Sequence, residues 1–383
     1  MKNRLKVTAE QLWEAIKAGL VLPANNTYTI PLVCAQEELA SSDALKVNYK
    51  FLHDRVQQAA YSLISEAEKK VTHLKIGQLL LKNLSPDERK ENIFTLVNQL
   101  NFSLDLITTQ CQKDELAELN LIAGQQAKLA TAYEAAKNYL NVALGVLADN
   151  SWSYNYKFTL TLYTEAIETE YLTSNFEPSN TLAEIALKQV KTLLEQVKIY
   201  ELQIYAYIAQ NKMQTALELG LQVLDKLDIK LEKEPPQIVA IEELEFLPEM
   251  NDIYKLSAIE ILIAIADPAY VSRPDLWLSL IFTQIALCLQ YGNSPKASYS
   301  YITYGLFLCG SLSNIETGYR FGKLALNLLE KFNSEALKAK IFSGFYGFIK
   351  QWKDPCRDTI EPLLKIFKLE RKPEIYSMQV MLF

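Results

Sequence analysis

The most constraining feature of this chain is the alternation of helix-forming segments with short breaks, which runs from residue 65 almost to the end. Segments of roughly 12–18 residues carry apolar residues at helical spacing, a pattern typical of stacked helical repeats. Glycine and proline are scarce, at 12 and 13 of 383 residues, which argues against an all-β or loop-rich fold. The sequence therefore predicts a mainly α fold, built as a helical-repeat superhelix.

The clearest repeat unit covers residues 121–147, where small residues would let two helices approach closely and large ones fill the gap to the next pair. These positions are Gly124, Ala127, Thr131, Tyr133, Ala136, Leu140, Ala143 and Leu144. The pattern resembles a tetratricopeptide repeat and recurs more loosely at residues 166–187 and 204–224. Aligning Ala136 with Ser179 and Ala216 gives offsets of 43 and 37 residues, so the repeats are degenerate.

Composition shifts divide the chain after residue 231. Pro235, Pro236, Pro248 and a cluster of glutamates predict a linker or kink over residues 232–250. Turn and capping signals then predict further helices up to residue 371, of which one is capped by Ser313 and its neighbours. The ranges are 251–266, 274–291, 295–308, 317–331, 335–352 and 355–369. Residues 372–383 form a tail without a closing polar helix, which is interpreted as a sign of truncation.

The first 64 residues have a different pattern. A capping box at residues 8–11 and Gly19 delimit a helix, and residues 20–22, 28–33 and 46–51 are strand-like, with a loop at 34–45. A second helix begins near His53, with Leu52, Val56, Ala59, Ala60 and Leu63 on one stripe. Helix, strand, hairpin and helix form the back half of a winged helix. The sequence thus predicts a partial winged-helix module at residues 1–64.

Composition also narrows the function classes. The net charge of −6 provides no basic field for nucleic acid, and the five cysteines are scattered without a CxxC pair. The first residues lack the apolar core of a signal peptide. The longest uncharged run, residues 297–315, contains four serines and two glycines and is better explained as a buried repeat helix than as a membrane span. We therefore expect a cytoplasmic protein with reduced thiols and no metal site.

Catalytic motifs are missing from the sequence. It contains no GxxxxGK[ST] phosphate loop, no GxGxxG, no kinase HRD or DFG element and no GxSxG. Glu242, Glu243 and Glu245 have no accompanying histidine or aspartate cluster, so a solvated linker face explains them better than paired acid catalysis. We therefore expect this chain not to be an enzyme.

The sharpest candidate for a binding site is His53 with Asp54, at the start of the second predicted helix. A helix N-terminus favours an anion, so His53 could donate to a phosphate while Asp54 caps backbone N–H groups. The alternative is that His53 bonds locally and Asp54 is merely a first-turn charge. The other histidine, His73, lies on an ordinary predicted helix and is interpreted as structural.

Tyrosine is abundant, with 21 residues, and a repeat surface rich in tyrosine could bind a peptide through aromatic anchors. The alternative for each one is packing between helices with the hydroxyl at the rim. The tyrosines in predicted helices are Tyr133, Tyr139, Tyr163, Tyr171, Tyr205, Tyr207, Tyr299, Tyr301 and Tyr304.

Residues 51–64 (FLHDRVQQAAYSLI), together with residues 73–81, 91–101, 130–136 and 206–212, resemble large bacterial signalling proteins. Those proteins combine a serine/threonine kinase domain, a STAND-type (AAA-like) ATPase, a tetratricopeptide-like array and often a sensor histidine kinase. Leu52-His53-Asp54 is similar to the Met-His-Asp signature of STAND winged helices. The resemblance implies that His53 contacts the phosphates of bound ADP, with Asp54 as its support. The phosphate loop is absent here, so ATP or ADP would belong to the parent protein and no cofactor to this chain.

Three hypotheses follow. The first is a non-catalytic regulatory segment that couples nucleotide state to contacts with a protein or peptide partner, or with neighbouring domains of the parent polypeptide. The second is a winged-helix transcription regulator of the STAND type with a ligand-sensing repeat array, against which the acidic charge argues. The third is that the chain belongs to an active kinase polypeptide.

Overall fold

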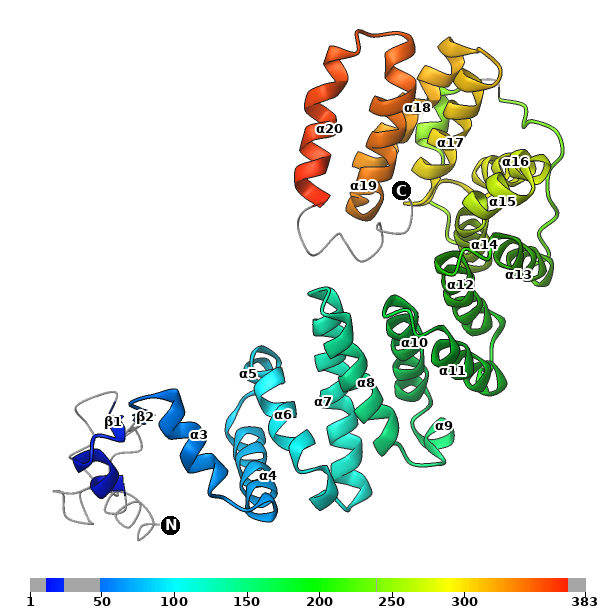
Figure 1. Ribbon diagram of the computed structural model, residues 1–383. Helices are drawn as coiled ribbons and strands as arrows, with labels where there is room; N and C mark the ends of the chain where they lie inside the picture. Colours follow the sequence, from blue (N-terminus) through cyan, green and yellow to red (C-terminus); the bar gives the residue numbers. More distant parts are fainter. Residues whose placement is uncertain (1–11, 24–48, 239, 371–383) are drawn as a thin grey trace. The chain divides into compact units, whose positions relative to one another are not determined.

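The computed structural model describes residues 12–23, 49–238 and 240–370, which form two compact units. Unit 1 comprises the described residues up to Ser85 together with Asn98–Leu106, and unit 2 comprises Pro86–Val97 and the described residues from Ile107 onward. Both units are mainly helical, as the sequence predicted (Figure 1).

Among its described residues, unit 1 contains helical residues 12–17, one short pair of strands and two complete helices. Strands β1 (Val21–Pro23) and β2 (Tyr49–Phe51) pair antiparallel, with Val21 opposite Phe51. They are followed by α3 (Asp54–Ser62), α4 (Glu66–Asn83), the last part of α6 (Ile93–Phe102) and the 3-10 turn η3 (Leu104–Leu106). Ser65 and Glu68 form a capping box at the start of α4.

The first strand lies one residue from its predicted position, and β2 covers the end of the predicted strand at residues 46–51. The predicted strand at 28–33, the loop at 34–45 and the capping box at 8–11 lie outside the described residues, as does the tail at 372–383. The predicted apolar stripe of α3 is not a buried face. Leu52 is 58% and Leu63 is 87% exposed, and α3 buries no residue within unit 1.

Unit 2 is a succession of helices. The first group is α5 (Pro86–Glu91), α7 (Gln110–Leu129), α8 (Tyr133–Val146), α9 (Ser151–Tyr154), α10 (Tyr156–Leu172), α11 (Phe176–Gln189), α12 (Leu193–Ala209) and α13 (Met213–Lys226). The second is α14 (Ile253–Ala264), α15 (Ala266–Ser272), α16 (Pro274–Tyr291), α17 (Ala297–Gly310), α18 (Ile315–Lys331), α19 (Glu335–Phe342) and α20 (Arg357–Glu370). A π-helical stretch η5 (Ser343–Ile349) and the turn η6 (Lys350–Trp352) continue α19.

Three helix pairs of unit 2 turn in the same way. Thr131, Ser174 and Asn211, which connect α7 to α8, α10 to α11 and α12 to α13, all have φ near +60°. Each is followed by a residue whose N–H bonds back five positions, from Ala132 to Ala127 O in the first pair. This is the left-handed C-terminal cap of a helix. The three turns are separated by the same 43 and 37 residues as Ala136, Ser179 and Ala216, so the sequence alignment matches the structural one.

Small residues let the helices of each pair approach closely, as the pattern predicted. Ala136 and Ala216 are fully buried, and the Ser179 hydroxyl donates to Ile167 O at 2.9 Å. In the first pair, a Cβ added to Gly124 would lie 2.7 Å from Leu140 Cγ. Such a distance leaves no room for a side chain, so α7 and α8 depend on glycine at this contact.

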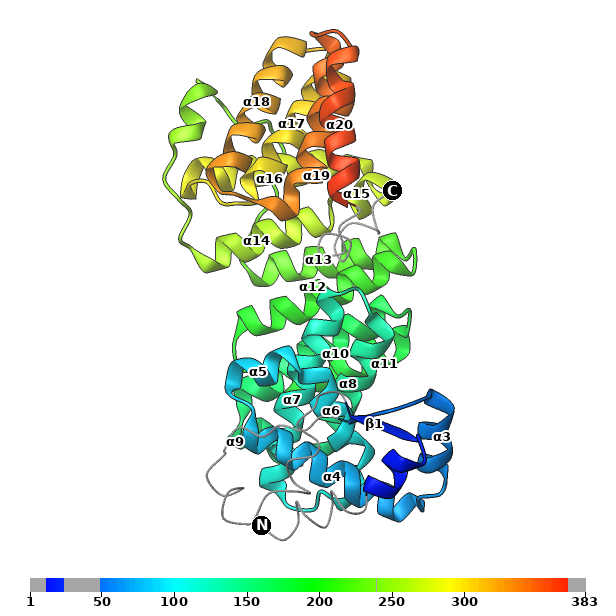
Figure 2. The ribbon, with the colours of Figure 1, turned by 90° about the vertical axis from the view of Figure 1, so that its left-hand side faces the viewer.

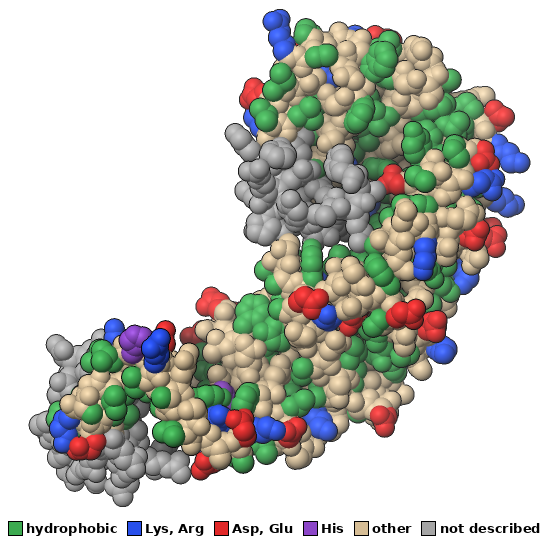
Figure 3. Space-filling view, viewed as in Figure 1, with side chains coloured by type: hydrophobic (Ala, Val, Ile, Leu, Met, Phe, Trp, Pro, Cys, Tyr) green, Lys and Arg blue, Asp and Glu red, His purple; other side chains and the backbone are tan. Residues whose placement is uncertain are grey.

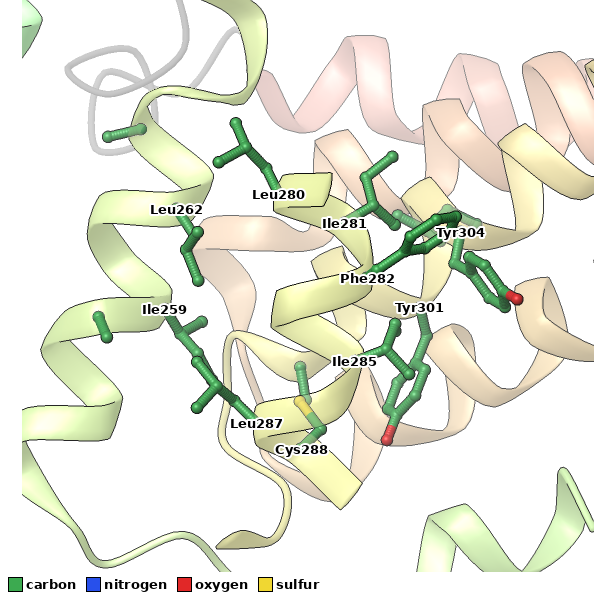
Figure 4. Close-up of a cluster of buried hydrophobic side chains, with 14 of the residues drawn as sticks. Ile259, Leu262, Leu280, Ile281, Phe282, Ile285, Leu287, Cys288, Tyr301 and Tyr304 are labelled. Carbon is green, nitrogen blue, oxygen red and sulfur yellow. The ribbon is translucent and has the colours of Figure 1, made fainter. Parts of the chain in front are cut away.

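The largest hydrophobic core of unit 2 joins α12 to α19 (Figure 4). Leu262 of α14 lies toward Leu280 of α16, whereas Ile285 of α16 lies on the side of Tyr301, and all three are fully buried. Residues 297–310, the main part of the long uncharged run, form α17 in this core, as expected for a buried repeat helix. Among the described residues, no helix combines the length and apolar character that a membrane span requires.

Residues 232–238 and 240–250, the described part of the predicted linker, form a segment that we call the strap (Figure 2). Its 3-10 helix η4 (Glu242–Phe246) packs on α18, and Ile241, Leu244 and Met250 are buried in the core. Asn293, at the turn between α16 and α17, makes three hydrogen bonds to the strap. Asn293 N donates to Pro248 O (2.8 Å), its carbonyl accepts from Met250 N (2.7 Å), and its side-chain Nδ2 donates to Leu244 O (2.6 Å).

Two local predictions need correction or refinement. Asn314, not Ser313, caps α18, because its side chain accepts from Thr317 N at 3.3 Å. Ser313 instead has φ +54° and ends the preceding turn. The predicted helix at 251–266 is divided at Ile265 into α14 and α15, whereas the predicted helix at 274–291 coincides with α16.

Candidate functional site

His53 is the N-cap of α3. Its backbone is extended, and its ring nitrogen Nδ1 accepts from Arg55 N at 3.4 Å. Both His53 and Asp54 are exposed, and Asp54 is the first-turn acid of α3. Because Nδ1 serves as the cap, Nε2 is the ring nitrogen left to meet a ligand. The geometry therefore gives His53 a local role within unit 1, and its predicted contact with a nucleotide phosphate stays a prediction.

His73 has a larger structural role than its sequence context indicates. Its Nδ1 lies 2.5 Å from Gln99 Oε1, and its Nε2 lies 2.8 Å from the Tyr61 hydroxyl. Since a carboxamide oxygen only accepts, Nδ1 carries the proton and Nε2 accepts from Tyr61. The ring also packs on Phe102 with centroids 4.3 Å apart. His73 thus connects α3, α4 and the end of α6, and no periodicity in the sequence could have revealed this junction.

In unit 2 a series of half-buried charged and tyrosine side chains runs across successive helices; we call it the polar row. At one end, Lys128 of α7 donates to Glu168 of α10 at 2.7 Å and also bonds Glu165. Burial lowers the pKa of Lys128, but the two carboxylates outweigh it and the pKa lies above its ordinary value. Gln125 donates to Glu165 at 3.1 Å. This end of the polar row is a closed charge network between two helix pairs.

The middle of the polar row is on α12. Glu201 is only 6% exposed and accepts from Lys198 at 2.8 Å. One turn further along the same helix lies Tyr205. Burial, and then the carboxylates of Glu201 and Glu260, raise the pKa of Tyr205 well above its usual range. The pKa of Tyr171 on α10 is raised in the same way, first by burial and then by the Glu168 carboxylate. Both hydroxyls therefore stay protonated and remain hydrogen-bond donors.

The far end of the polar row involves α14, α15, α17 and α19. Lys296 pairs with Glu260 at 3.2 Å, and the Lys340 ammonium lies 5.5 Å from the centre of the Tyr299 ring. Burial raises the pKa of Asp267, and the positive charge of Lys340 only partly offsets this rise. Burial likewise lowers the pKa of Lys340, and the negative charge of Asp267 only partly offsets this fall. Within the described residues neither of these two groups belongs to an ion pair. They are therefore the charges of the row with most to gain from an added partner.

The two interpretations of the tyrosines, peptide anchors or packing between helices, apply to different members of the set. Tyr171, Tyr301 and Tyr304 are buried, and the Tyr301 hydroxyl donates to Asn293 Oδ1 at 3.1 Å. The other six of the nine predicted tyrosines are half-buried, and none is exposed. Packing explains Tyr301 and Tyr304 fully, whereas Tyr205 and Tyr299 lie among the charges of the polar row.

The chemical groups of the polar row are suited to recognition of a polar ligand. Its members are carboxylates, ammonium groups and protonated phenols, and the acidic and basic side chains in view on unit 2 are interspersed (Figure 3). In the part of the chain that is described, no three histidine, cysteine, aspartate or glutamate side chains are grouped as metal ligands. The buried thiol of Cys288 has its pKa raised by burial to about 12, so it is not a reactive nucleophile.

Comparison with known proteins gives one distant relative. No family model matches the chain. The chain is 23% identical over 385 aligned positions to the hybrid signal transduction histidine kinase G of Dictyostelium discoideum. The match covers 85% of this chain but only 11% of that protein's length. This distant similarity connects the helical array with a segment of a multidomain signal-transduction kinase.

Proposed function

We propose that this chain is a non-catalytic regulatory segment of a multidomain signal-transduction protein, and that it acts through protein–protein contacts. In this proposal unit 2 is a tetratricopeptide-like array. The residues up to 64 are the winged-helix end of a STAND-type ATPase module. A protein or peptide partner, or a neighbouring domain of the parent polypeptide, would occupy the polar row.

The polar row is the observation that carries the proposal. Between packed helices the expected lining is apolar, yet here lysines, glutamates and tyrosines continue from α7 to α19. Most charges are already paired, which keeps the row ordered before anything binds. Among the residues that the structure describes, Asp267 and Lys340 have no such pairs, so a polar segment that carried both charge signs would gain most at this end.

The distant relative supports the signalling context, since its name describes a signal-transduction histidine kinase. In the proposed mechanism, exchange of ATP for ADP in the ATPase module of the parent protein moves the segment that contains His53 and Asp54. The attached helices then transmit that bias to whatever occupies the polar row. The chain itself performs no chemistry.

Calorimetry tests the non-catalytic part. We expect the purified chain, titrated with ATP or ADP in the presence of Mg²⁺, to give only heats of dilution. Tight nucleotide binding by this chain alone would contradict the proposal. The DNA-binding alternative has its own test, because affinity for duplex DNA that falls steeply with salt would favour a transcription regulator.

Selection of displayed random peptides on the full chain tests the polar row. We expect selected peptides to lose affinity when Tyr205→Ala or Tyr299→Ala is introduced. Tyr254→Ala serves as the matched control, since Tyr254 is 44% exposed at the start of α14 and, among the described residues, its hydroxyl has no hydrogen bond to the row's charged groups. Peptides that bind all three variants equally well would show that the polar row is not the recognition surface.

A further inference from the structure

The strap carries an aromatic side chain that the core does not use. Phe246, at the end of η4, is 80% exposed, whereas Leu244 two residues earlier is 5% exposed and Leu247 packs against the core. An isolated exposed apolar residue is common at protein surfaces and needs no explanation. Phe246 differs in two respects. Hydrogen bonds fix the backbone on either side of it, and the strap that carries it is acidic.

Side chains of α18 hold η4 from one side. The Arg320 guanidinium binds the Glu242 carboxylate in bidentate geometry, at 2.8 and 2.5 Å. Asn327 donates to Glu245 Oε2, and Lys331 donates to Glu245 O, both at 2.7 Å. Together with the Asn293–Leu244 bond, these contacts fix the backbone on either side of Phe246. An anchor that is held in place before binding loses little conformational entropy on binding.

From Glu234 onward the charged side chains of the strap itself have one sign, and the cations that reach η4, Arg320 and Lys331, come from α18. From Glu234 to Asp252 the sequence contains six carboxylates and no lysine or arginine. Glu242 and Glu245 are used by α18, whereas Glu243 and Glu249 are exposed. Within the described residues, neither of the latter two carboxylates has a hydrogen bond or ion pair. In a 3-10 helix residues three apart lie on the same side, so Glu243 stands beside Phe246.

We propose that Phe246 with Glu243 and Glu249 is a docking knob for a basic amphipathic helix of a partner protein. The phenyl ring would insert between apolar side chains one turn apart on that helix, as a knob enters a hole. Lysine or arginine residues beside the apolar stripe would pair with Glu243 and Glu249. This surface is separate from the polar row and does not depend on the function proposed for it.

A membrane surface fits these observations less well. Anionic headgroups would be repelled by Glu243 and Glu249, and a single phenyl ring is a small anchor for an acidic segment. A partner with the opposite charge, and an apolar site for one ring, matches both features of the knob.

A peptide built only of leucine and lysine, with an amphipathic helical pattern, is the probe. We expect it to bind the full chain in a fluorescence-anisotropy titration at low salt. Phe246→Ala should weaken binding by at least about tenfold, as expected for an aromatic hot spot. Glu243→Lys combined with Glu249→Lys should weaken it by a similar factor. Because all three side chains are exposed, the unfolding midpoint of each variant should equal that of the wild type.

The matched control is Phe348→Ala. Phe348 is 61% exposed but lies beside Lys350 and Lys353 in the sequence, so its loss should leave the affinity unchanged. A leucine–glutamate peptide of the same pattern should not bind. The proposal is overturned if the wild type fails to bind the leucine–lysine peptide, or if Phe246→Ala binds it as tightly. Binding of phosphatidylcholine vesicles that disappears in Phe246→Ala would also overturn it, by assigning the knob to a membrane.

Discussion

Units 1 and 2 are both helical but are stabilised in different ways. In unit 2 helix after helix buries aliphatic and aromatic side chains, and even the strap contributes Ile241, Leu244 and Met250 to the core. In unit 1, α3 buries nothing and is joined to α4 and α6 by the polar contacts of His73. Because burial of apolar area is the main driving force of folding, unit 2 should unfold cooperatively, whereas α3 should open locally.

The largest expected loss of stability is at Gly292, where the fold of unit 2 depends on backbone geometry. Gly292 has φ +101° and ψ −179°, and a Cβ there would lie 2.2 Å from Pro248 O. Gly292→Ala adds backbone strain to a clash with the strap, so we expect unit 2 to lose about 3 kcal/mol or more. Denaturant unfolding followed by tryptophan fluorescence measures this loss. Gly310→Ala is the control, since a Cβ at Gly310 would meet no atom within 4 Å. Equal midpoints for the two variants would contradict this account of the strap.

Asn293→Ala tests the side-chain hydrogen bonds of the neighbouring residue. The substitution removes the donor to Leu244 O and the acceptor of the Tyr301 hydroxyl, both in the buried interior. Leaving a buried polar group unsatisfied costs about 1–3 kcal/mol, so a total loss of about 2–3 kcal/mol is expected. Thermal unfolding of unit 2 provides the measurement. Tyr301→Phe, which removes only one of these bonds, should cost less, and the reverse order would refute the assignment.

His73→Phe examines unit 1. Phenylalanine keeps an aromatic ring against Phe102 but cannot bond Tyr61 or Gln99, so we expect a loss of about 1 kcal/mol confined to unit 1. Hydrogen exchange should become faster at the amides of α3, while the unfolding of unit 2 stays unchanged. Lys75→Ala is the control, because Lys75 lies exposed on the same helix as His73 and exchange at α3 should stay unchanged. Faster exchange in unit 2 would show that the two units are not stabilised separately.

The sequence was informative where stability comes from local spacing. The bounds of α16 and the register of the three helix pairs followed from apolar periodicity and turn residues. The contacts that distinguish the two units join distant residues, such as Glu242 with Arg320, 78 positions apart, and His73 with Gln99, 26 apart. Neither pair repeats along the chain, so no periodicity predicts it. For the same reason the sequence predicted a linker at residues 232–250. It indicated the polar row only through an excess of tyrosine.

The smallest expected effect is a gain in stability in unit 2. Thr131 has φ +59°, and a β-branched residue in the left-handed region is strained where glycine is not. Thr131→Gly should relieve that strain, and part of the gain is offset by the greater freedom of glycine in the unfolded chain. We expect a net stabilisation of about 0.5–1 kcal/mol, measured by denaturant unfolding. Asn211→Gly, at the equivalent turn of another pair, should gain less because asparagine tolerates this backbone conformation better. If both substitutions destabilise unit 2 instead, the turn side chains themselves contribute to its stability, and apolar packing is not its only source.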